Sequence, residues 1–115
     1  MKTAKQTNKE RLGHITDAIQ KIESYTADVS EATFLENPML YDAVLYQFTI
    51  IGEAIVHVGN ESLDKYDYPW HEVRAFRNLI AHQYFGVRLD KVWSIVENDL
   101  PELKKTVELI IKNEF

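Results

Sequence analysis

Four side chains of different chemistry lie close together in the segment RAFRNLIAHQY, residues 74–84: the cation Arg77, the amide Asn78, the imidazole His82 and the phenol Tyr84. Arginine presents a planar fork of N–H donors that matches a phosphate. Histidine can take a proton from a 2′-hydroxyl or give one to a leaving 5′-oxygen near neutral pH. Asparagine can orient either group, and tyrosine can donate to a phosphate oxygen. Together these types favour phosphoryl transfer on RNA, without a metal, because the RNA supplies its own nucleophilic hydroxyl.

A helix that opens at Pro69 and ends at Gly86 is predicted to carry this segment. At about 100° per residue, the cation and the phenol return to within about 20° of each other, and the amide and imidazole lie about 100° to 140° away. All four side chains therefore line one half of the predicted helix. Phe76 and Leu79 fall on the other half and are predicted to enter the core.

The spacing alone leaves a plainer interpretation open, in which Arg77 pairs with a nearby carboxylate and His82 caps the helix or extends its ring towards solvent. One chain also offers only one clear proton-transfer residue, whereas RNA cleavage uses both an acid and a base. Two such helices that face each other across a dimer would supply both.

A second unusual feature is Gly52-Glu53 within the apolar run FTIIGEAIVHVG. Glycine inside a helix costs roughly 1 kcal/mol relative to alanine, which suggests close approach by a neighbouring helix. Glu53 is predicted to bind Arg77 or Arg74 and orient it, or else to lie at a rim where its carboxylate reaches water.

Composition limits the classes of protein that this chain can be. It has 115 residues, 45% hydrophobic residues, a net charge of −5 and no cysteine, so disulfide scaffolds and thiolate zinc sites are excluded. Glu53 and His57 have the i,i+4 spacing of metal ligands but no third ligand in register, so no metal and no cofactor is predicted. We expect one helical domain over residues 1–115, with a polar leader at residues 1–8. No signal peptide or membrane span is apparent, which predicts a cytoplasmic protein without a membrane partner.

Charge is unevenly distributed along the chain. Residues 71–91 hold four cations and two carboxylates, a net charge of +2, so the remaining residues sum to −7. A local positive site on an acidic body suits a focused anion contact better than a long nucleic-acid footprint.

Helical periodicity runs through the chain, and no segment alternates like a strand, so the predicted fold is all-α, a four- to five-helix and mainly antiparallel bundle. A helix over residues 8–27 should bury one stripe, namely Leu12, Ile15, Ile19, Ile22 and Tyr25. Ser30 and Asn37 are predicted N-caps, the second followed by Pro38. That second helix should reach Val58.

The predicted helix ends rest on glycine, proline and capping residues. Gly59-Asn60 is predicted to be a left-handed pair. Asp90 could cap the next helix, and Pro101 should kink or break it. Asp99, with a glutamate three residues on, resembles a capping box for a new helix to about Lys112.

The remaining aromatic and histidine residues are predicted to have structural or surface positions. Trp70 and Trp93 are predicted to anchor the core or a dimer interface, with base stacking as the alternative. His14 and His71 are predicted to lie at the surface.

The motif Arg77-x4-His82-x-Tyr84 resembles the HepT-like branch of the HEPN (higher eukaryotes and prokaryotes nucleotide-binding) superfamily. The resemblance extends over nearly the whole chain, because further landmarks follow in the expected order: IIGEA at 50–54, PWHEV at 69–73, VW at 92–93 and NDLPELKK at 98–105.

This resemblance implies a homodimeric, all-helical toxin of an MNT–HEPN toxin–antitoxin system, which cleaves RNA without metal through a composite site. Arg77 would polarise the scissile phosphate, His82 would be the general acid or base, and Asn78 would help to position them. Tyr84 would be the residue on which a nucleotidyltransferase antitoxin, using ATP, places AMP. The RNA would be a tRNA or an mRNA. The competing reading is a non-catalytic helical module that binds a nucleotide or a nucleotidyltransferase subunit.

Overall fold

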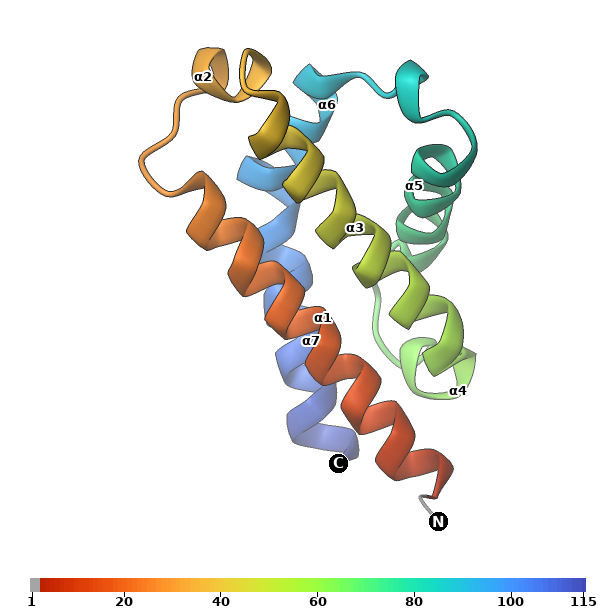
Figure 1. Ribbon diagram of the computed structural model, residues 1–115. Coiled ribbons are helices and arrows are strands. Elements are labelled where there is room, and N and C mark those ends of the chain that lie inside the picture. Colours follow the sequence, from red (N-terminus) through yellow and green to blue (C-terminus); the bar gives the residue numbers. More distant parts are fainter. Residues whose placement is uncertain (1–2) are drawn as a thin grey trace.

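The computed structural model describes residues 3–115, and within that range every regular element is helical (Figure 1). Four long helices form the bundle: α1 (Ala4–Thr26), α3 (Pro38–Val58), α5 (Trp70–His82) and α7 (Leu100–Glu114). Helix α3 is central and packs most extensively against α1 and α5, while α7 packs against α1. The predicted all-α bundle is confirmed. Residues 1–2 of the predicted leader lie outside the described residues, and residues 4–8 belong to α1.

Helix α1 contributes the stripe that its sequence predicts. Leu12, Ile15, Ile19 and Ile22 are fully buried, whereas Tyr25 is 37% exposed and lies outside the core. Each fully buried aliphatic side chain stabilises the fold by about 1.5–3 kcal/mol relative to its exposed state. The hydrophobic stripe therefore fixes α1 against the rest of the bundle.

Both predicted N-caps are present. The Ser30 hydroxyl accepts the Thr33 N–H at 3.2 Å and starts the short helix α2 (Glu31–Leu35). The Asn37 side-chain oxygen accepts the Leu40 N–H at 3.2 Å at the start of α3. Each bond satisfies a backbone donor that the first helical turn leaves free.

The chain leaves α3 through Gly59, whose φ of 82° is positive, as predicted, although its ψ of 179° lies outside the left-handed helical region. The prediction for Asn60 is wrong, because this residue begins the short helix α4 (Asn60–Leu63) in an ordinary helical conformation. Glycine has no Cβ and adopts positive φ without strain, so the turn needs only one such residue.

The C-terminal third of the chain stays helical from Leu89 to Glu114, as α6 (Leu89–Ser94), the π-helical turn η2 (Ile95–Asp99) and α7. Pro101 cannot donate a backbone hydrogen bond, and the helix accommodates it by widening into η2 just before it. The predicted break is therefore wrong, since a π turn lets the helix continue.

Neither predicted cap in this region is used. Helix α6 begins after Arg88, and the Asp90 carboxylate pairs with the Arg88 guanidinium at 2.9 Å. Asp99 has helical dihedral angles and makes no side-chain cap bond, because a helix that has not ended leaves no free N–H groups to cap.

Helix α3 is long and apolar enough, by length and composition alone, to cross a membrane, which differs from the sequence expectation. Its buried residues face α1 and α5 within the bundle. Central helices of globular folds pass the same test, so this property is weak evidence for a membrane span.

Both tryptophans are buried, as predicted for core anchors. The Trp70 indole N–H donates to the Leu63 carbonyl at 3.0 Å, which ties the start of α5 to α4. His14 and His71 are exposed, as predicted.

Candidate active site

The helix that carries the motif ends sooner than its sequence predicts. Helix α5 ends at His82, and Gln83, with φ of −139° and ψ of 49°, leaves the helical conformation. Tyr84 then begins the 3-10 turn η1 (Tyr84–Gly86). The prediction that all four motif side chains line one half of a single helix is therefore wrong for Tyr84, which lies beyond the helix end.

The buried face of α5 lies on the same side as Arg77. Trp70 and Ile80 are buried and lie within about 60° of Arg77 around the helix axis. Phe76 is half-buried and packs edge-on against Phe48, with ring centroids 5.2 Å apart. Leu79, predicted to be a core residue, points away from this face and is 38% exposed.

Arg77 is held by Glu53 of α3. The Nη2 of Arg77 donates to Glu53 Oε2, and its Nη1 donates to the Asn78 side-chain oxygen at 3.0 Å. The contact predicted between Glu53 and the motif arginine is confirmed. Arg74, the other predicted partner, instead donates to Asn60 at 2.7 Å. The Arg77 side chain is 29% exposed, although its Nε is buried.

Gly52 allows α5 to come this close. A Cβ built at Gly52 would overlap the Cβ of Arg77 and lie 2.7 Å from its Cγ. The close helix approach predicted from a glycine inside α3 is confirmed, and it occurs at the motif arginine itself.

The second oxygen of Glu53 contacts His57 at 3.0 Å, one helical turn further along α3. Hydrogen bonds from His57 and then from Arg77 lower the pKa of the Glu53 carboxyl below its usual value. Among the described residues, no group of three His, Asp or Glu side chains is placed to hold a metal ion. Glu53 is instead a single carboxylate that accepts hydrogen bonds from both His57 and Arg77.

Asp42 of α3 holds the other end of the motif, because it accepts a hydrogen bond from the Tyr84 hydroxyl. This bond, followed by desolvation, raises the pKa of Tyr84 to about 12. Sequence reasoning missed Asp42. A signal was present: Asp42 and Glu53 are eleven residues apart, which puts them on one face of α3, about 16 Å apart along its axis.

His82 and Asn78 differ from Arg77 in their surroundings. Both are exposed, and within the described part of the chain His82 makes no hydrogen bond or ion pair. Phe85, next to Tyr84, is 99% exposed. The structure thus combines an Arg77 guanidinium that is bound to Glu53 with an exposed His82 imidazole that a ligand can reach.

A family model described as "Ribonuclease HepT-like" matches residues 15–110. The chain is 39% identical over 102 residues to a Methanocaldococcus jannaschii protein named as a gamma-glutamylcyclotransferase and proposed RNase; the match covers 88% of this chain and 46% of that protein. A second protein of that organism, whose name proposes an RNase, is 34% identical, with 84% of this chain and 89% of the relative covered. The "Probable ribonuclease HepT" of Thermococcus cleftensis is 33% identical, with 94% and 99% covered.

No solved structure matches the chain. The family match nevertheless covers most of the sequence and includes both α3, which carries Glu53, and α5, which carries the motif. Relatives of nearly the same length agree with it. The chain belongs to the HepT-like ribonuclease family.

Proposed function

We propose that this chain cleaves RNA without a metal, with Arg77 binding the scissile phosphate and His82 transferring protons. The 2′-hydroxyl attacks phosphorus, the bond to the 5′-oxygen breaks, and a cyclic phosphate and a free 5′-hydroxyl result. One imidazole takes the proton of the attacking hydroxyl, and another gives a proton to the leaving oxygen. The observation that supports this best is that one helix carries both an Arg77 held by Glu53 and an exposed His82 whose side chain has no partner among the described residues.

The acid and the base are proposed to come from two copies of the chain. Arg77 and His82 of one helix diverge by about 140°, which disfavours one phosphate lying between both of them. Exposed apolar side chains surround this site: Met39 is 85% exposed, Tyr46 64% and Phe85 99%. Met39 and Tyr46 flank Asp42 on one face of α3, so they lie beside the Tyr84 turn. A second copy on this face would bury them and bring a second His82 to the site.

A mixing experiment tests the composite site. Arg77→Ala and His82→Ala chains are each expected to lose RNA cleavage by about 10²–10⁴-fold. In a refolded equal mixture of wild-type and His82→Ala chains, only about a quarter of the dimers pair two wild-type chains and keep both imidazoles, so the rate should fall to about a quarter of that of wild-type chain at the same total concentration. A fall to only about one half would mean that each chain uses its own imidazole alone and would contradict the composite site. Activity retained by either single variant would contradict the catalytic assignment.

We further propose that a partner nucleotidyltransferase of the MNT type silences this enzyme by moving AMP from ATP to Tyr84. The Tyr84 oxygen would bond to the α-phosphorus of ATP, pyrophosphate would leave, and the phenolic proton would pass to a base. Tyr84 is 38% exposed on a short surface turn, which supports access. An added AMP would put bulk and negative charge close to the proposed RNA-binding surface, and both would oppose binding of the RNA phosphates.

Intact mass after incubation with the partner and ATP tests this regulation. The wild-type chain should gain the mass of AMP and lose RNA cleavage together, whereas Tyr84→Phe should do neither. Tyr25→Phe is a suitable control, because Tyr25 of α1 is 37% exposed, nearly the same as Tyr84 at 38%, and lies outside the proposed interface. AMP addition to the Tyr84→Phe chain would place the modification elsewhere.

A further inference from the structure

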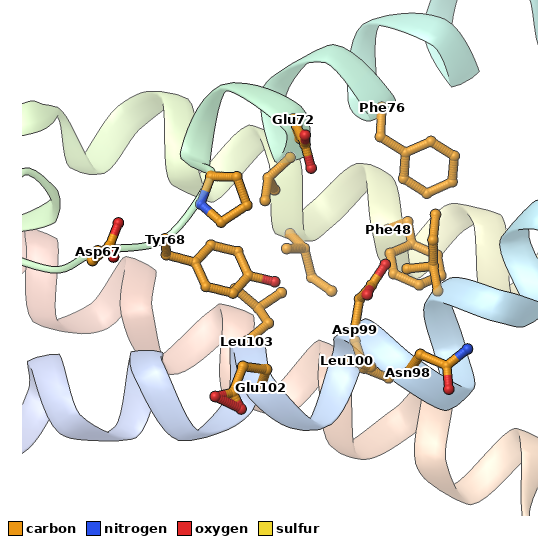
Figure 2. Close-up of a pocket in the computed structure, with 14 residues that line it drawn as sticks. Phe48, Asp67, Tyr68, Glu72, Phe76, Asn98, Asp99, Leu100, Glu102 and Leu103 are labelled. Atoms are coloured by element: carbon orange, nitrogen blue, oxygen red, sulfur yellow. The ribbon is translucent and has the colours of Figure 1, made fainter.

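A pocket of about 410 Å³ opens where α3, the start of α5 and the junction of η2 with α7 meet (Figure 2). Its volume is within the range of roughly 300–1,000 Å³ typical of small-molecule sites. Neither Arg77, His82 nor Tyr84 lines it. The pocket is therefore a separate feature from the RNA site, and the family assignment does not explain it.

The floor of the pocket is apolar and aromatic. Phe48 and Phe76 meet edge to face there, and Ile51 and Leu103 also line it. Figure 2 shows both phenylalanine rings on one side of the pocket and the Tyr68 ring on another. Such a surface gains free energy by covering apolar groups of a ligand, and its ring faces attract a cation.

The rim of the pocket is acidic. Glu72, Asp99 and Glu102 line it, and within the described part of the chain none of their carboxylates forms an ion pair. Burial raises the pKa of Tyr68 to about 12, and these three carboxylates add to the rise. The Tyr68 hydroxyl points toward the middle of the pocket in Figure 2, and all three carboxylates raise its pKa.

The π turn η2 shapes this rim. Asp99 is its last residue, and Asn98 and Ile95 of the same turn also line the pocket. Widened turns of this kind re-aim side chains and are frequent at functional sites. Pro101, which has no N–H to continue the ordinary helical bonding, lies just beyond the turn and so contributes to the placement of Asp99.

We propose that this pocket binds a small organic cation, an ammonium group on an apolar body, with the body on the Phe48–Phe76 floor and the ammonium among Glu72, Asp99 and Glu102. A neutral molecule of the same shape would gain only the contact with the floor. An anion would be repelled by the rim. The pocket is therefore expected to select ligands that carry both an ammonium group and an apolar body, because charge-assisted hydrogen bonds to the carboxylates require the ammonium.

The test measures binding of 2-phenylethylammonium to the full chain by calorimetry and by amide NMR, with 2-phenylethanol as the uncharged match. The cation should bind about tenfold or more tightly than the alcohol, since a charge-assisted hydrogen bond is worth about 1.5–3 kcal/mol. Its amide shifts should centre on Tyr68 and Asn98. Equal binding of the two molecules, or shifts centred elsewhere, would overturn the proposal, and so would absence of any binding of the cation at millimolar concentration.

Substitutions test whether the three rim carboxylates give the pocket its preference for the cation. Glu72→Gln, Asp99→Asn and Glu102→Gln each keep side-chain size and are exposed, and together they should remove the preference for the cation over the alcohol. Glu108→Gln, on α7 but outside the pocket lining, should leave it unchanged. Should the triple variant not fold, the single variants and the comparison of the two wild-type ligands still decide. Cation preference that survives in all the pocket variants would contradict the site.

Discussion

Gly52 of α3 lies so close to Arg77 of α5 that the Cβ of any other residue at this position would overlap the arginine side chain. The next residue on α3, Glu53, binds the guanidinium of the same arginine. One turn of α3 therefore both allows α5 to pack closely and binds the guanidinium of Arg77. A glycine that weakens α3 by its own propensity is compensated by the contact it permits. Helix packing and the orientation of the candidate phosphate-binding residue are thus the same structural feature.

Replacing Gly52 with alanine should separate α3 from α5 at this point. A Cβ there overlaps the Cβ of Arg77, whose position is fixed by the backbone of α5 and which no side-chain rotation can move. We expect a loss of about 1–3 kcal/mol in the free energy of unfolding, measured by urea denaturation, together with a lower rate of RNA cleavage.

The matched control is Gly13→Ala on α1, where, apart from the adjacent residues and the backbone of α1 itself, no described atom lies within 4 Å of the added Cβ. That substitution should be neutral or should stabilise the chain by up to about 1 kcal/mol through helix propensity. Similar effects at the two positions would show that propensity, and not the contact with Arg77, governs the result at Gly52.

Glu53→Gln should keep the shape of the contact and remove its charge. The hydrogen bonds from His57 and Arg77 that lower the pKa of Glu53 stabilise its ionised form. This contribution is present at neutral pH and is lost as pH falls through the lowered pKa of the folded state. Carboxyl NMR should show Glu53 titrating below the usual glutamate range. The variant should bind RNA more weakly and cleave it more slowly, while Glu108→Gln does not.

A Glu53→Gln chain with unchanged cleavage and unchanged stability would remove the positioning role. Loss of stability alone, with cleavage unaffected, would reduce the ion pair to a packing contact.

The helices and the approach of α5 to α3 were predictable from local sequence. The stripe from Leu12 to Ile22, the caps at Ser30 and Asn37, and the glycine at position 52 each act over one or two turns, so their spacing is sufficient. Glu53 was found because a charged residue inside an apolar helix needs a partner.

The errors arose where tertiary contacts decide the local conformation. Tyr84 was placed on the helix because spacing cannot show that the chain leaves α5 at Gln83 and that the phenol reaches Asp42 of α3. The break expected at Pro101 does not occur, because packing of the flanking residues keeps the helix continuous through a π turn. Both cases involve one residue whose conformation is set by a neighbouring element.

Gln47 is a buried polar residue of α3, 5% exposed, and its side-chain oxygen has no hydrogen-bond partner among the described residues. A buried acceptor without a partner costs about 1–3 kcal/mol. Gln47→Met, which is similar in shape and has no such acceptor, should raise the free energy of unfolding by about 1 kcal/mol. The exposed Gln20 on α1, changed to methionine, should show no such gain. A loss of stability in Gln47→Met would mean that the oxygen is satisfied in solution.

Tyr84 should lose its proton only at unusually high pH, and Asp42 should be the main reason. The hydrogen bond to Asp42 raises the pKa of Tyr84 to about 12. Because the folded-state pKa is raised, this contact stabilises the fold fully below pH of about 10 and is lost as pH rises toward 12. Ultraviolet titration of the phenolate, with the Tyr84→Phe spectrum subtracted, isolates this group. In Asp42→Asn the transition should move down toward the usual tyrosine value, and an unmoved transition would show that desolvation, rather than the carboxylate, holds the proton.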